Sequence, residues 1–229
     1  MAHTPSKNTP SLQALLKAGD VDAARAAATG RLAASANDRE ALVALAKIAL
    51  LDGDLDAARL QIARADILGA DDVDSLLVKA AVSAQSDDEP DVSIALYEKA
   101  IAQARPPRAE AHFGLAMVLA SARRFRLALA QFRLAVDLEP EVGPFHFHYA
   151  KALLADEQVE PGLQHLEKAL ALSPTHAPIY EACVFVLLEF GYPEAAEALL
   201  TEGLKALPGH PLLRSLLAKV MVAQGRLPR

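Results

Sequence analysis

The chain has little cysteine, few aromatic residues and no long apolar run. Cys183 is the only cysteine among 229 residues, which excludes an internal disulfide and a cysteine-based metal cluster. The longest apolar stretches, residues 41–51 and 182–188, are well short of the ~20 residues that span a membrane. Residues 1–10 are polar and lack the apolar segment of a signal peptide. We therefore expect no membrane span and no export signal, and a cytoplasmic location.

The sequence also lacks the common motifs of enzymes and of metal and phosphate sites. The sequence has no Gly-rich phosphate loop, no Gly-x-Ser-x-Gly and no His or Cys spacing typical of metal ligands. His146 and His148 are two residues apart, so on a helix they point in different directions. The net charge of −6 argues against non-specific nucleic-acid binding, which needs a basic surface. These absences predict a protein that is not an enzyme and holds no cofactor, no metal and no nucleic acid.

What the chain does contain favours helices. Apolar residues make up 52% of it, which is too many for a disordered chain. With 5% aromatic residues and no Trp, Ala and Leu must fill the interior, and both are strong helix formers. Runs of β-branched residues are scarce. The composition predicts an all-α protein, and its richness in Ala favours a bacterial one.

A repeat of 34 residues organises the chain. Pro140, Pro174 and Pro208 follow each other at that interval, and each ends a run rich in Ala and Leu. Proline lacks the backbone N–H and clashes with the preceding helical turn, so it stops a helix. The period therefore marks the ends of helices.

Each period contains two apolar stripes at helical spacing with a break between them. In residues 109–139 the break is at 121–124, and the stripes are Leu115, Ala116 and Leu119, then Ala128, Phe132, Ala135 and Val136. The pattern predicts six helix pairs, near residues 5–38, 39–73, 74–108, 109–142, 143–176 and 177–210, and a closing helix at 211–224. Thr9 and Pro10 are expected to start the first helix, and Pro90 to start the second helix of the third pair. We expect one elongated domain over residues 1–229, stabilised by contacts between neighbouring repeats.

The repeat that begins at Ala109 resembles the tetratricopeptide repeat. That family has helix pairs of this length, with small residues where the helices cross and a proline near the end. The stripes above and Pro140 fall on the family's positions, while His112, His146 and Tyr180 stand where the family has an early Trp. The resemblance implies a right-handed superhelical solenoid of antiparallel helix pairs that binds a protein or peptide.

The resemblance also implies where a partner binds. First helices of successive repeats line a concave face in this family, through positions 2, 5, 9 and 12 of each repeat. Positions 5 and 9 are Val43 and Lys47, Val78 and Val82, Phe113 and Met117, Phe147 and Lys151, Glu181 and Phe185, and Ser215 and Lys219. All of these except Val43 and Ser215 are the candidate contact residues.

Four of these candidates, Phe113, Met117, Phe147 and Phe185, are large and apolar. Together they predict a docking site for an apolar or amphipathic segment, and the lysines beside them suit acidic groups of the partner. The alternative is that packing between repeats covers these side chains. Some relatives clamp a C-terminal carboxylate with Lys and Asn, but the two asparagines of this chain, Asn8 and Asn37, are not at these positions.

Charge is segregated along the chain. Residues 52–91 hold eleven acids and three bases, whereas residues 99–133 hold seven bases and one acid. Arg123, Arg124 and Arg126 share an inter-helix turn, where they either contact an acidic partner or form a solvated edge. The acidic run 87–89 is interpreted as a solvated turn. Cys183 falls on a packing stripe, which predicts an inert, buried thiol.

The leading hypothesis is a scaffold or adaptor that binds a protein or peptide in a concave, partly apolar groove. One alternative is the substrate-recognition region of a larger transferase-type enzyme. A second is a chaperone for a secreted or membrane-targeted client. A third is a self-assembling scaffold, and homo-oligomers through the apolar stripe of the closing helix stay possible.

Overall fold

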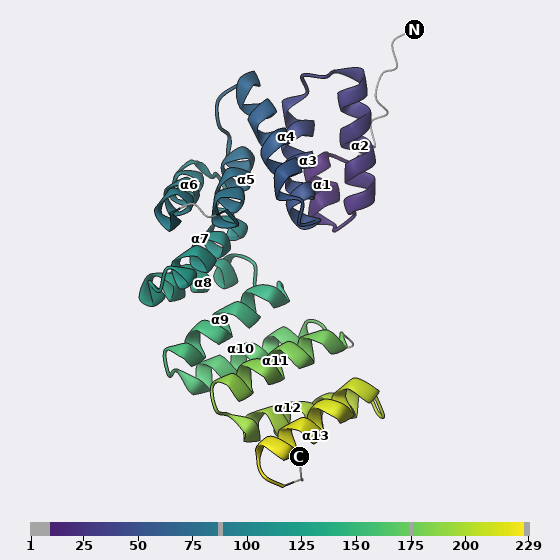
Figure 1. The fold of residues 1–229 in the computed structure, drawn as a ribbon, viewed down its shortest axis with the longest axis vertical. Coiled ribbons are helices and arrows are strands. Elements are labelled where there is room, and N and C mark those ends of the chain that lie inside the picture. The colour runs from purple at the N-terminus through teal and green to yellow at the C-terminus, as the bar shows by residue number, and fades with distance from the viewer. Residues whose placement is uncertain (1–9, 87–88, 175, 227–229) are drawn as a thin grey trace. The chain divides into compact units, whose positions relative to one another are not determined.

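The protein is all-helical, as a computed structural model of the chain shows (Figure 1). The structure describes residues 10–86, 89–174 and 176–226, and over these residues it contains thirteen helices and no strand. The predicted all-α solenoid of helix pairs is confirmed. The chain divides into two compact units, Met1–Pro107 (unit 1) and Arg108–Arg229 (unit 2). The expectation of one continuous domain stays a prediction.

Unit 1 consists of three helix pairs. Its helices are α1 (Leu12–Lys17), α2 (Val21–Ala34), α3 (Arg39–Leu51), α4 (Leu55–Leu68), α5 (Val73–Ala84) and α6 (Pro90–Gln103). The predicted start of the first helix at Pro10 is wrong by two residues, because Ser11 is the N-cap and its hydroxyl accepts a hydrogen bond from the Ala14 N–H. Thr9 lies outside the described residues. Pro90 begins α6, as predicted.

Aspartates start most helices of unit 1. In each case the carboxylate accepts a hydrogen bond from the backbone N–H three residues on, a contact that contributes about 1 kcal/mol to helix stability. These N-caps are Asp20, Asp38, Asp54 and Asp72. Gly19 and Gly53 precede two of them with φ of 75° and 77°, a conformation that glycine adopts without strain. The same Gly-Asp sequence thus forms the turn and the N-cap before both α2 and α4.

Part of the acidic excess in unit 1 is structural. Lys79 on α5 pairs with Asp66 at 2.7 Å and with Asp71 at 2.5 Å, and Lys99 on α6 pairs with Asp71 at 2.9 Å. These contacts lower the pKa of the Asp71 carboxyl, first through the hydrogen bond from Lys79. The aspartates therefore join α4, α5 and α6 rather than form an open acidic surface.

Unit 2 consists of three further pairs and the closing helix. They are α7 (Ala109–Ser121), α8 (Phe125–Leu138), α9 (Gly143–Ala155), α10 (Val159–Ala171), α11 (Ala177–Glu189), α12 (Pro193–Ala206) and α13 (Pro211–Ala223). Four of these helices, α9, α11, α12 and α13, carry Pro in their first two positions, where its missing N–H costs nothing. Within this unit the pairs stack in chain order from α7 to α13 (Figure 1).

The core of unit 2 follows the predicted stripes. Leu166, Leu187, Leu200 and Leu213 are fully buried and belong to one cluster that runs from α9 to α13. On the closing helix, Leu213, Leu216 and Val220 are all buried. The predicted stripe of α13 thus packs on the sixth pair.

Candidate functional site

In unit 1 the apolar candidates are part of the core. Val78 and Val82 on α5 are 2% and 9% exposed, and they share a cluster with Val43 and Ala46 on α3. Lys47 is partly buried one turn after Val43. A partner that meets this side of unit 1 cannot reach the two α5 valines, so they offer no contact surface in this structure.

Phe113 on α7 is half-buried in an aromatic cluster of unit 2. Its ring centroid lies 4.7 Å from that of Phe145, 5.9 Å from that of Phe132 and 5.4 Å from the His148 ring. Phe145 and Phe132 are themselves buried. Phe113 therefore contributes mainly to packing between α7, α8 and α9, which was the alternative interpretation of this position.

The α9 candidates are Phe147 and Lys151. Phe147 is half-buried against the core cluster of unit 2, with its ring edge-on to His148 at 5.2 Å between centroids. Lys151 is exposed and lies 3.7 Å from a carboxylate oxygen of Glu189 on α11. Burial, and then the charge of Lys151, lowers the pKa of His148. The salt bridge joins two consecutive first helices across the surface that a partner would meet.

The remaining candidates are exposed. Phe185 on α11 is 66% exposed and Met117 on α7 is 39% exposed. Glu181 on α11 and Lys219 on α13 are exposed as well. Phe185, Met117, Lys151 and Lys219 hold the same position in successive repeats. We use "first-helix surface" for the following set: Met117, Phe147, Lys151, Glu181, Phe185 and Lys219.

The three arginines of the predicted basic edge are exposed. Arg123 and Arg124 lie at the turn between α7 and α8, with Arg123 at a φ of 60°, whereas Arg126 lies in the first turn of α8. The Arg123 guanidinium lies over the Phe125 ring, 5.8 Å from its centroid. Of the acidic run, Asp87 and Asp88 lie outside the described residues, and Glu89 is exposed.

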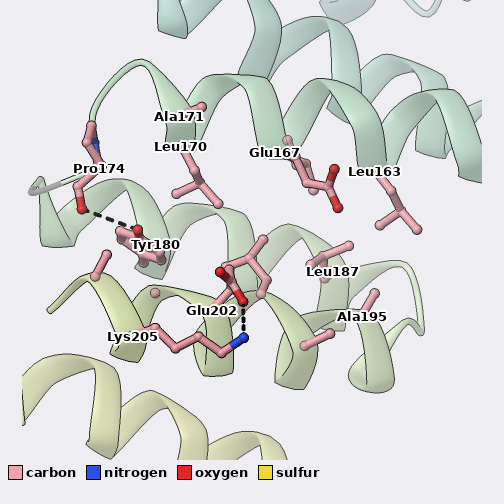
Figure 2. A pocket seen from close by; sticks show the side chains of 15 residues that line it. Leu163, Glu167, Leu170, Ala171, Pro174, Tyr180, Leu187, Ala195, Glu202 and Lys205 are labelled. Atoms are coloured by element: carbon pink, nitrogen blue, oxygen red, sulfur yellow. Dashed lines mark hydrogen bonds and ion pairs between the residues drawn. The ribbon is translucent and has the colours of Figure 1, made fainter. Parts of the chain in front are cut away.

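A pocket that sequence reasoning missed lies between α10 and α12 of unit 2 (Figure 2). It has a volume of about 890 Å³ and is formed by α10 and α12, with Tyr180 and Leu187 of α11 between them. Its lining is mostly apolar, with Glu167 on α10 and an ion pair between Glu202 and Lys205, at 2.6 Å, on α12. The Tyr180 hydroxyl donates to the Pro174 carbonyl at 3.2 Å and fixes one wall.

A histidine pair was also missed, in which His146 is buried and His165 is partly buried. The Nε2 of His146 lies 2.8 Å from the Pro140 carbonyl, so it donates, and its Nδ1 lies 2.8 Å from Nδ1 of His165. His112 and Gln131 make the same contact one repeat earlier, at 2.7 Å. The sequence signal was two polar pairs, each 19 residues apart and offset by one repeat. Such pairs connect the two helices of a repeat.

Three further observations bear on chemistry. The Cys183 thiol is buried as predicted, and burial raises its pKa to about 12. No group of three or more His, Cys, Asp or Glu side chains suited to a metal occurs among the described residues. Within the same residues, none of the helices combines the length and hydropathy that crossing a bilayer requires.

Fold and surface together define a helical-repeat scaffold. Comparison with protein families narrows the class, because one tetratricopeptide repeat model matches residues 12–73 and 78–142 and a second matches residues 153–220. The chain belongs to the tetratricopeptide repeat family, which places it among protein–protein interaction scaffolds. No curated protein matches it in sequence.

Solved structures with the same fold cover most of the chain. The chain is similar to PilW, described as a type IV pilus biogenesis factor, with a TM-score of 0.69, 17% identity and coverage of 90% of this chain and 94% of that one. It is also similar to the Cut9–Hcn1 assembly of the APC/C (TM-score 0.70, 17% identity, 92% of this chain and 41% of that one). PilF of Pseudomonas aeruginosa gives a TM-score of 0.62 at 14% identity, over 91% of this chain and 94% of that one. At these identities the likeness extends to the fold alone.

Proposed function

We propose that the protein is a non-catalytic adaptor that binds a protein or peptide segment through the first-helix surface of unit 2. The observation that carries this proposal is Phe185, whose ring is 66% exposed at a repeat position flanked by lysines one repeat before and after, Lys151 and Lys219. Burying a Phe side chain stabilises a complex by about 1.5–3 kcal/mol, so an exposed ring at this place favours a partner.

The chemistry of the surface defines the partner. Met117, Phe147 and Phe185 offer apolar contacts on three consecutive first helices, and the ammonium groups of Lys151 and Lys219 attract carboxylates. The partner segment therefore carries large apolar residues together with acidic ones. Lys151 is already engaged with Glu189, so an incoming carboxylate competes for it.

A comparison of binding partners tests the proposal. The tagged full chain is used to isolate partners from its source cells, in parallel with Phe185→Ala and with Leu60→Ala as a matched control. Leu60 on α4 is 59% exposed, so the control removes a similarly exposed apolar side chain from unit 1. We expect mass spectrometry to find a partner that Leu60→Ala retains and Phe185→Ala loses. Equal recovery with both variants would show that the partner uses another surface.

The proposal places the adaptor in a bacterial cytoplasm, where the buried Cys183 stays reduced. The transferase-region and chaperone hypotheses use the same surface with a different partner. The identity of the isolated protein therefore distinguishes them.

A further inference from the structure

The pocket between α10 and α12 has no role in the function proposed above, because none of its lining residues belongs to the first-helix surface. Its walls are Leu163, Leu166 and Leu170 on one side and Ala195 and Leu199 on the other. A cavity of about 890 Å³ with this lining is large enough for several aliphatic side chains. Figure 2 shows Glu167 and Glu202 on the two opposing helices.

One charge of the pocket has no partner within the described part of the chain. Glu202 is neutralised by Lys205 at 2.6 Å, but no ion pair or hydrogen bond engages the carboxylate of Glu167. An apolar cavity with one free carboxylate at its edge suits a segment that brings aliphatic side chains together with one cation. The occupant is therefore basic and amphipathic.

The same unit carries a helix with that chemistry. Leu127, Leu134 and Leu138 on α8 are 58%, 38% and 39% exposed, and their spacing places them on one face. Arg126 and Arg133 precede the first two leucines, so the pair Arg-Leu recurs after seven residues in nearly the same orientation. Both arginines are exposed, and neither makes an ion pair within the described residues.

The leucine stripe of α8 and the pocket lining on α12 have the same length. From Leu127 to Leu138 the leucine stripe rises by about 16 Å along α8, at roughly 1.5 Å per residue. The lining of the pocket on α12 runs from Ala195 to Ala206, which is the same number of residues and therefore also about 16 Å. A helix with the stripe of α8 can thus contact the pocket along its whole length.

We propose that the pocket binds α8 of a second copy of this chain, with the leucine stripe in the cavity and Arg133 beside Glu167. Because pocket and stripe are different surfaces of one copy, the contact is head to tail. Three leucines and one ion pair make an interface smaller than the ~800 Å² per partner of stable complexes. We therefore expect weak association, with a Kd of about 10 µM to 1 mM.

Reciprocal charge reversal tests the proposal in the full chain. Sedimentation equilibrium from about 1 µM to 1 mM should show association of the wild type. Glu167→Arg and Arg133→Glu each place like charges together and should weaken it by about tenfold or more. Mixing the two variants restores opposite charges at every contact, so association should return to the wild-type level. Circular dichroism confirms that both surface variants are folded.

Matched controls carry the same charge changes elsewhere. Glu181→Arg on α11 and Lys219→Glu on α13 lie on the first-helix surface and should leave self-association unchanged. A monomeric wild type at the highest concentration would overturn the proposal and leave the pocket to a different partner or an apolar ligand. Association that survives both Glu167→Arg and Arg133→Glu would overturn the proposal, because it would show that the copies meet through another surface. Association that only Lys219→Glu weakens would also overturn it and would place the contact on the closing helix.

Discussion

Phe113 and Phe185 both lie on first helices, at positions 5 and 9 of their repeats, but the structure predicts that replacing them by Ala has very different effects. Phe113 is half-buried and contacts two buried phenylalanine rings. Losing half of a Phe burial costs about 1–1.5 kcal/mol, and each aromatic pair adds about 0.5–1.5 kcal/mol. Phe113→Ala should therefore lower the free energy of unfolding by about 2–4 kcal/mol. Phe185 is 66% exposed, so Phe185→Ala should cost below about 1 kcal/mol.

Urea unfolding followed by far-UV circular dichroism measures the difference. Helical repeats need not unfold in one step, so the transition that contains unit 2 is compared between variants under identical conditions. We expect Phe113→Ala to shift this transition clearly to lower urea and Phe185→Ala to leave it almost unchanged. Equal shifts would contradict the burial on which the first-helix surface is defined. The result also decides which variant is a clean probe of binding, since a destabilised chain loses partners for trivial reasons.

Three further predictions concern single sites. Burial, and then the charge of His146, lowers the pKa of His165, so the folded state binds fewer protons than the unfolded state. Stability should fall as the pH drops below about 6.5, and His165→Gln should flatten that fall in denaturation curves measured from neutral to mildly acidic pH. Asp54→Ala removes the N-cap of α4 and should cost about 1 kcal/mol, whereas Asp56→Ala, at an exposed site in the same turn, should stay within about 0.5 kcal/mol; thermal melts compare the two. Cys183, with a pKa of about 12, should react with a thiol reagent only after unfolding, and labelling of the native protein at the rate of a free thiol would contradict its burial.

The fold could be predicted closely from the sequence because the repeat carries two independent signals, one for where helices end and one for where the two helices of a pair cross. Prolines at 140, 174 and 208 mark helix ends, and the small residues Ala128, Gly162 and Ala196 mark crossings within pairs. From α3 onward the first helices begin where the period requires, apart from α5, which begins at Val73, one residue before the predicted repeat. The start of α1 was misplaced because Ser11 and Thr9 are both suitable N-caps and local sequence does not choose between them.

The site was less predictable because exposure depends on neighbours from other helices. Val82, Met117 and Phe185 share one repeat position, yet the first is buried and the last is the most exposed of the three. Nothing in the residues of α10 alone indicates that the space beside Leu163 and Glu167 is open. That space depends on the separation of α10 and α12, which packing on α11 sets.

Site-specific photo-crosslinking tests the central claim most directly. A photoreactive amino acid is placed at position 185 in the full chain, and in a separate sample at position 60, whose native leucine is similarly exposed on α4. Irradiation with the partner present should join it to position 185 and leave position 60 uncrosslinked, with the linked peptide rich in apolar and acidic residues. Crosslinks at position 60 alone, or at neither position while the complex persists, would contradict binding through the first-helix surface.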